Sequence, residues 1–204
     1  MKKATVIILL ALMSMLTLNA AGDERALPPV YSYLSLQSGY NATVSDADGF
    51  QQAVPLSFQS GVLSNSDDGS YALGFGTRVD IDFGVGSDAS LFSMDVLLGA
   101  DVLLRLNDHV SFGLLAGLDV AVVDSESHND GIVTMGPGAV FLTRLSPMRS
   151  GALAFDIGLA AYGHFALGED YAGASLVPFV GITFDFSSFP YLFYPYHVSH
   201  VIVF

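Results

Sequence analysis

The segment of this chain that most resembles a catalytic group lies between positions 124 and 130. It reads Asp-Ser-Glu-Ser-His-Asn-Asp, so His128 lies within three residues of Ser125 and Ser127. A histidine next to a serine is the pair that activates a hydroxyl nucleophile by general-base catalysis. Acidic side chains surround this pair, which makes a poor environment for a nucleophile. We therefore interpret the segment as a solvated acidic loop and predict no catalytic residue.

Metal binding is the second chemistry that the side chains allow. Carboxylate oxygens are ligands for Ca²⁺, and further acidic residues in predicted loops offer them, namely Asp46, Asp48, Asp88, Glu169 and Asp170. The spacing of an EF-hand is missing. His197 and His200 lie close in sequence but lack a third ligand. The chain has no cysteine, which excludes disulfides and thiolate sites. We predict no metal site and no cofactor.

The elements that would position these residues follow a two-residue alternation, which is clearest from Tyr71 to Val85. Odd positions there are mostly large and hydrophobic, whereas even positions are small or charged, with Arg78, Asp80 and Asp82 among them. Successive side chains of a strand point to opposite faces. The segment exceeds the about 5–6 residues of an average strand and suits the roughly 9–11 that cross a bilayer at a tilt.

The hydrophobic segment 91–106 distinguishes a strand from a helix. As a membrane helix it would bury Asp95, Asp101 and Arg105, and each charge at a helix centre costs about 2.5–3.5 kcal/mol on insertion scales. A period of two instead places all three charges on one face and most of the large hydrophobic residues on the other. The segment is therefore predicted to be a strand.

Eight segments show this pattern, and short turn-like sequences join them. The predicted strands are 31–43, 52–63, 71–85, 91–106, 109–123, 132–145, 152–167 and 174–186. Pro55, Pro137 and Pro178 cost ladder hydrogen bonds and predict bulges or strand ends. Hydrophobic side chains face outward and charges inward, the reverse of a soluble barrel. The fold class is therefore all-β, an eight-stranded antiparallel up-and-down transmembrane barrel.

The inward face collects a set of charged residues that we predict to form a lumen charge network. Its members are Arg78, Asp80, Asp82, Asp95, Asp101, Arg105, Asp119, Arg144, Asp156, His164 and Asp185. Eight strands leave an interior just wide enough for side chains to fill. We interpret the set as a structural ion-pair plug, the alternative being a narrow conduit or ligand site. We expect Asp80 and Asp101 to hold Arg78.

The N-terminus has the features of a secretory signal over residues 1–21. Lys2 and Lys3 precede a hydrophobic run that ends before the small residues Ala20 and Ala21. The chain has 7 basic and 20 acidic residues and a formal net charge of −13 at pH 7. Nucleic-acid binding requires a basic surface, so we exclude it.

The strand count, the alternation and the aromatic end of the last strand resemble the small eight-stranded outer-membrane barrels of the OmpA, OmpX and OmpW type. The resemblance covers about residues 30 to 186, and we assign residues 22–186 to the barrel domain. The segment 181–186 is similar to the β-signal by which such barrels are recognised for assembly, and Phe184 and Phe186 carry it. An aromatic tail follows at 187–204, and its terminal Phe204 is a second candidate signal.

The expected function is therefore that of an integral outer-membrane protein of a diderm bacterium that is not an enzyme. We expect a monomer whose partners are outer-membrane lipid and the barrel-assembly machinery. Its role would be in envelope structure or surface interaction. The OmpW resemblance implies a porin-like role instead, the slow passage of small solutes, including hydrophobic ones. The competing hypotheses are a lipid-modifying enzyme that uses His128 and a nearby serine, and a secreted ligand-binding barrel.

Overall fold

A computed structural model of the protein describes residues 30–85, 92–125, 128–147, 153–166 and 170–185. Within these residues the chain forms strands that run almost end to end, with short connections. The strands are β1 (Val30–Gly39), β2 (Asn41–Ser45), β3 (Gly49–Asn65), β4 (Tyr71–Gly84), β5 (Phe92–Arg105), β6 (Val110–Ser125), β7 (His128–Leu145), β8 (Leu153–Ala166) and β9 (Ala172–Asp185).

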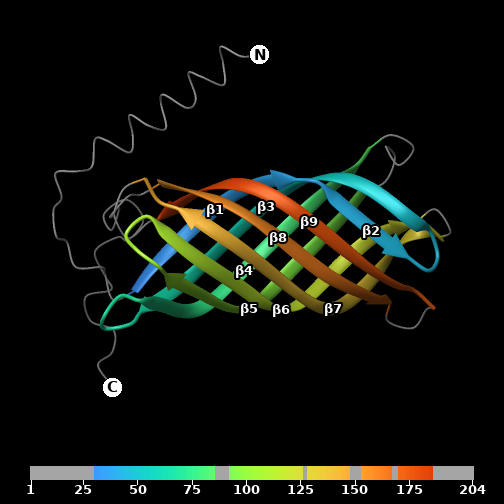
Figure 1. The fold of residues 1–204 in the computed structure, drawn as a ribbon. Coiled ribbons are helices and arrows are strands. Elements are labelled where there is room, and N and C mark those ends of the chain that lie inside the picture. Colours follow the sequence, from blue (N-terminus) through green and yellow to red (C-terminus); the bar gives the residue numbers. More distant parts are fainter. Residues whose placement is uncertain (1–29, 86–91, 126–127, 148–152, 167–169, 186–204) are drawn as a thin grey trace, which may run out of the picture.

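The strands close into a barrel because every strand has antiparallel partners along both of its edges (Figure 1). β3 to β9 follow one another around the wall in chain order. β1 and β2 lie end to end, and both pair with β3 on one side and β9 on the other. Together they occupy one strand position, so the barrel wall has eight strand positions. This confirms the predicted all-β, eight-stranded antiparallel fold.

The break between β1 and β2 has a local cause in the two flanking strands. Direct pairing with β3 and β9 stops at Ser38 and Gly39 and resumes beyond Tyr40. Pro55 of β3 and Pro178 of β9 lie beside this break, and proline has no N–H to give to a ladder. Both proline-bearing strands continue. The predicted strand end therefore occurs in the strand between the prolines.

The two ends of the barrel differ in the segments that they hold. At the terminal end, β1 begins, β9 finishes, β7 ends and β8 begins, and the connections 66–70 and 106–109 turn the chain back. At the opposite, loop end, β2 turns into β3 through residues 46–48, and Gly49 adopts a φ of 72°. β6 runs to Ser125 and β7 begins at His128. Most of the predicted acidic loop is therefore strand, because the ladder continues to the end of the hairpin.

The proposed signal segment 1–21, the tail 187–204, Phe186 and Phe204 lie outside the described residues. No helix in the described ranges is long and hydrophobic enough to cross a membrane.

The alternation sorts the side chains between wall and interior as the sequence predicts. Leu98 and Leu118, for example, are exposed on the outside, while the neighbouring Leu97 and Asp119 are buried inside. The same pattern runs through β4 and β8. The barrel interior is therefore the place where the polar side chains meet.

Candidate functional site

Every member of the predicted lumen charge set lies on the inward face of the wall. Nine of them are buried: Arg78, Asp80, Asp82, Asp95, Asp101, Asp119, Arg144, Asp156 and His164. Arg105 and Asp185 are half-buried at the terminal end. The strands thus gather the charges inside the barrel.

Arg78 of β4 is held at the centre of the barrel. Its Nε donates to Asp80 Oδ1 at 2.9 Å, which forms an ion pair between two buried side chains. Nη1 donates to the amide oxygen of Gln37, and Nη2 donates to Ser57 Oγ at 3.0 Å. The guanidinium carbon also lies 4.4 Å from the centre of the Phe179 ring. This cation therefore has partners from four strands.

Asp101 does not hold Arg78, so that part of the prediction is wrong. Asp101 pairs with Gly74 across β4 and β5, whereas Arg78 pairs with Leu97. The four-residue offset corresponds to about 13 Å along the strand. Asp101 instead accepts a hydrogen bond from the Tyr33 hydroxyl.

Arg144 of β7 forms the second ion pair, nearer the terminal end. Nε and Nη2 donate to the two carboxylate oxygens of Asp156 at 2.8 and 2.9 Å, the bidentate arrangement that makes an arginine–carboxylate pair strong. Thr183 also donates to Asp156, at 2.5 Å. The guanidinium carbon lies 4.8 Å from the centre of the Tyr33 ring. Neither Arg144 nor Asp156 has a buried side-chain atom without a hydrogen-bond partner.

Arg105 closes the interior at the terminal end. It donates to the backbone oxygen of Gly69 at 3.0 Å and to the Tyr31 hydroxyl at 3.2 Å. Tyr31 packs with Leu63 and Leu103 in a buried hydrophobic cluster. These contacts form an aromatic and aliphatic floor beneath the two ion pairs.

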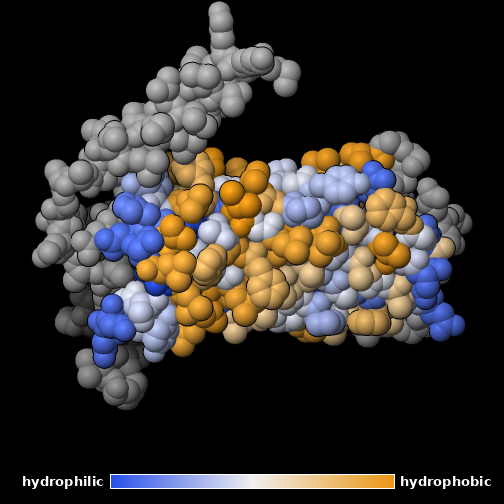
Figure 2. All heavy atoms as spheres, viewed as in Figure 1, coloured by the Kyte–Doolittle hydropathy of each residue, from blue (hydrophilic) through white to orange (hydrophobic). Residues whose placement is uncertain are grey.

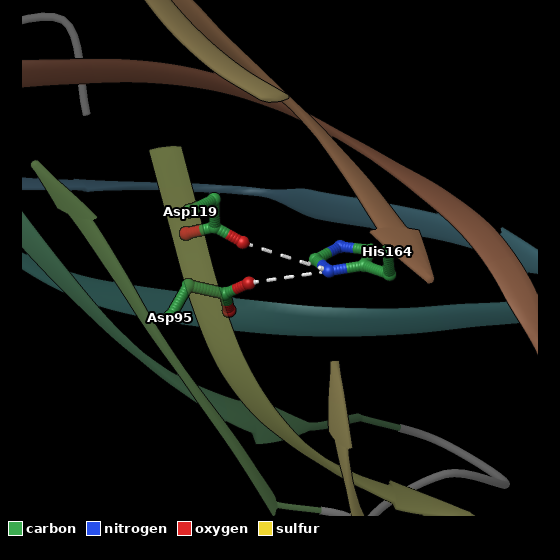
Figure 3. A group of neighbouring side chains, drawn as sticks. All are labelled: Asp95, Asp119 and His164. Carbon is green, nitrogen blue, oxygen red and sulfur yellow. Dashed lines mark ion pairs between the residues drawn. The ribbon is translucent and has the colours of Figure 1, made fainter. Parts of the chain in front are cut away.

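The loop half of the interior has a different composition, shown in Figure 3. Asp95 of β5 and Asp119 of β6 point toward His164 of β8, each with one carboxylate oxygen 3.7 Å from the imidazole Nδ1. Asp82 lies near them and accepts hydrogen bonds from Asn41 at 2.8 Å and from Ser93 at 3.1 Å. These three acids are clustered without an arginine among their described contacts.

A small cavity adjoins this acidic cluster at the loop end. Its volume is about 30 Å³, and its lining includes Asp82, Asp95, His164 and Ser175. This exceeds the roughly 10–15 Å³ that one water needs. A hydrophobic cluster fills part of the interior; its members are Leu97, Leu115, Val140, Leu142, Ala160, Tyr162, Val177 and Phe179.

The sequence interpretation left out uncharged residues that are essential to these contacts. Tyr33, Gln37 and Gln59 form a buried chain between the two arginine sites, and Tyr162 donates to Asp80. All four have inward parity in the predicted strands. Counting every polar residue of that parity, and not only the charged ones, would have found them.

The proposed enzyme group cannot be built from the described side chains. Ser125 and His128 pair across the turn between β6 and β7, and Ser127 lies outside the described residues.

The outer wall carries large exposed hydrophobic residues on every strand of the barrel. Figure 2 shows one side, where hydrophobic residues cover much of the wall and hydrophilic ones gather toward the ends. Examples from around the circumference are Leu36, Phe58, Phe75, Leu98, Leu118, Phe141, Ile157 and Val180. Monomeric soluble proteins rarely expose contiguous hydrophobic surface of more than a few hundred Å².

Comparison with known proteins places the fold. No protein-family profile and no curated protein sequence match the chain. Among solved structures, neisserial surface protein A (NspA) matches with a TM-score of 0.54 and 13% identity, over 78% of this chain and 99% of that chain. Ail, the attachment invasion locus protein of Yersinia pestis, gives 0.44 and 14%, over 75% and 99%. The chain thus has the fold of the small eight-stranded outer-membrane barrels.

Proposed function

We propose that this chain is an integral protein of a bacterial outer membrane that acts in envelope structure or surface interaction and is not an enzyme. The proposal rests on the barrel wall, whose outer face is hydrophobic and whose inner face is charged, the reverse of a soluble barrel. In a bilayer, only a closed barrel satisfies the backbone hydrogen bonds of strands. The exposed residues Phe75 and Leu98 would then contact lipid, while Arg78 and Asp80 stay inside.

The filled interior favours a structural or interaction role over the passage of solutes. Arg78 is 0% exposed, and its partners reach across the barrel from β1, β3 and β9. Leu97, Leu115 and Phe179 fill the space beside it. A solute would have to displace an ion pair and a hydrophobic layer. General diffusion channels have wider barrels of about 16 strands.

The route to the membrane belongs to the same proposal. The signal segment 1–21 would export the chain, and the assembly machinery would insert it as a monomer by recognising the aromatic end of the barrel. Phe184 is exposed on the wall of β9, where such recognition can take place.

Fractionation and electrical recording of the full chain test this proposal. We expect the expressed protein in the outer-membrane fraction, with faster gel mobility when unboiled, and a silent record in planar bilayers. Recovery as a detergent-free periplasmic monomer would overturn the membrane assignment in favour of a secreted ligand-binding barrel. Steady small conductance steps would overturn the closed interior. A lipid-modifying activity that His128→Ala abolishes would make the protein an enzyme.

A further inference from the structure

Three side chains from three strands converge in the loop half of the barrel. Asp95, Asp119 and His164 each place one potential ligand atom within 4.8 Å of the others. The imidazole Nδ1 is 3.7 Å from Asp95 Oδ1 and 3.7 Å from Asp119 Oδ2. These distances are longer than a hydrogen bond, which spans about 2.7–3.2 Å between heavy atoms. Both carboxylates point toward the imidazole Nδ1, and dashed lines mark the two contacts in Figure 3.

Asp119 lacks the partners that a buried charge needs, whereas Asp95 shares a side-chain hydrogen bond with Asp82. Asp119 is 0% exposed and Asp95 is 3% exposed. Neither oxygen of Asp119 has a hydrogen bond in the described structure, and nor does Oδ1 of Asp95. The described strands contain only three cationic side chains besides histidine, Arg78, Arg105 and Arg144, and none pairs with these acids. Buried charges are found paired or bound to metals.

The protonation state of His164 follows from a chain of hydrogen bonds that starts at Asp82. The Asp82 carboxylate is an acceptor and takes a hydrogen bond from Asn41 Nδ2 at 2.8 Å. That contact fixes the orientation of the Asn41 amide, so its Oδ1 is left as an acceptor. Thr43 donates its hydroxyl proton to this oxygen at 3.2 Å. The one proton of Thr43 is then used.

The chain continues to the imidazole. Ser175 Oγ lies 2.7 Å from Thr43 Oγ1 and must donate to it, because Thr43 has no second proton. Ser175 can therefore only accept from His164 Nε2, which lies 2.7 Å away. Nε2 carries the proton, and the bare Nδ1 faces the two carboxylates. Thr134 Oγ1 is 3.5 Å from Nδ1, the outer limit of a hydrogen bond.

We propose that Asp95, Asp119 and His164 bind a divalent first-row transition-metal ion, of which Zn²⁺ is the probe. One nitrogen and two oxygens are a ligand set that Zn²⁺ takes at about 2.0–2.2 Å. Two atoms 3.7 Å apart that both lie about 2.1 Å from one ion subtend about 120° there, near the tetrahedral angle of about 109°. An imidazole ligand selects such ions over Mg²⁺ and Ca²⁺.

The surroundings of the three ligands match those of metal sites. A metal-bound histidine almost always donates its second N–H to a neighbour that orients the ring, as His164 does to Ser175. Asp95 and His164 line the cavity of about 30 Å³, which gives water access from the loop end. The bound ion would supply the positive charge that arginine supplies in the rest of the interior. This binding goes beyond the proposed function and does not depend on it.

Zinc titration of the untagged, full-length protein tests the site. In detergent, after treatment with a chelator, calorimetry should show one high-affinity Zn²⁺ per chain. His164→Gln and Asp119→Asn should each weaken binding at least 100-fold. Ser175→Ala keeps the ligands but loses the orienting contact and should weaken binding by about 10–100-fold. His109→Gln is the matched control, because His109 lies in an exposed turn at the terminal end and should leave binding unchanged.

Co²⁺ absorption and gel mobility keep this test independent of folding defects. The visible bands of a Co²⁺ complex should appear with the native chain and disappear with His164→Gln. Each variant should retain heat-modifiable mobility, which reports an intact barrel. The proposal is overturned if the native chain binds no Zn²⁺, or if folded Asp119→Asn binds as tightly as the native chain. Binding that only His109→Gln removes would also overturn it.

Discussion

The two halves of the barrel interior share one wall but keep their charges in different ways. Toward the terminal end, Arg78 and Arg144 neutralise Asp80 and Asp156 through close ion pairs. Toward the loop end, Asp82, Asp95 and Asp119 lie with His164 and without an arginine among their described contacts. The alternation that builds the wall is the same in both halves. The wall therefore determines only that polar groups point inward, and not that positive and negative charges are equal in number there.

This difference has an energetic consequence. Breaking a buried ion pair by removing one partner costs about 3–5 kcal/mol, because an uncompensated charge remains. In the arginine half Asp80 and Asp156 already have such a partner. In the acidic half the charges repel one another until a cation binds, and removal of one charge should relieve them. Neutralising one carboxylate should thus lower the free energy of unfolding in the arginine half and raise it in the acidic half.

Arg78→Ala should produce the largest effect, because it makes the centre of the barrel resemble the acidic half. Asp80 would keep only the Tyr162 hydroxyl, and the free energy of unfolding should fall by about 3–5 kcal/mol. Urea unfolding of the refolded barrel measures it. Arg105→Ala is the control, since the half-buried Arg105 donates to Gly69 and Tyr31. Equal, small losses in both variants would show that the interior is wet.

Leu98→Arg places an arginine on the outside of the wall, and we expect it to lower the free energy of unfolding by the next largest amount. Leu98 is 46% exposed near the middle of β5. At the midplane of a bilayer, arginine on the lipid face costs about 2–4 kcal/mol, whereas near the interface it costs about 0–1 kcal/mol. Leu104→Arg, near the end of the strand, is the matched control. Unfolding from lipid vesicles should separate the two variants, and a soluble barrel would show no difference.

Protonation of Asp68 in an exposed turn should have the smallest effect on stability. It shows how a carboxylate in water differs from the buried ones. Hydrogen bonds from Ser66 and Ser70 lower its pKa from 3.8 to about 2. Because the folded pKa is the lower one, the turn gains stability that is complete above about pH 4 and is lost as the pH falls toward 2. NMR titration of this carboxyl should give a midpoint near 2. A midpoint near 4 would show that the turn is not formed.

Much of this fold was predictable because alternation is a local signal. The eight strand positions and their inward and outward faces follow from the residue type at every second position, as in Leu118 and Asp119. The break before β2 was less accessible, since its cause lies in Pro55 and Pro178 of two other strands. The extension of β6 to Ser125 was missed because polar residues suggested a loop.

The partners inside the barrel could not be predicted in the same way. Which inward residues meet depends on strand stagger, and the alternation does not determine it. Asp101 therefore contacts Tyr33 rather than Arg78. Asp95, Asp119 and His164 come from β5, β6 and β8, and only the closed barrel brings them together. The sequence placed each of them inward, but their convergence is a property of the fold.

The most direct test of the two-halves account compares Asp156→Asn with Asp119→Asn by urea unfolding at pH 8 in the presence of a chelator. Asp156→Asn leaves Arg144 without its bidentate partner, and the free energy of unfolding should fall by about 3–5 kcal/mol. Asp119→Asn removes one of the unpartnered carboxylates, and the free energy of unfolding should rise. Destabilisation of the barrel by both substitutions would contradict the account.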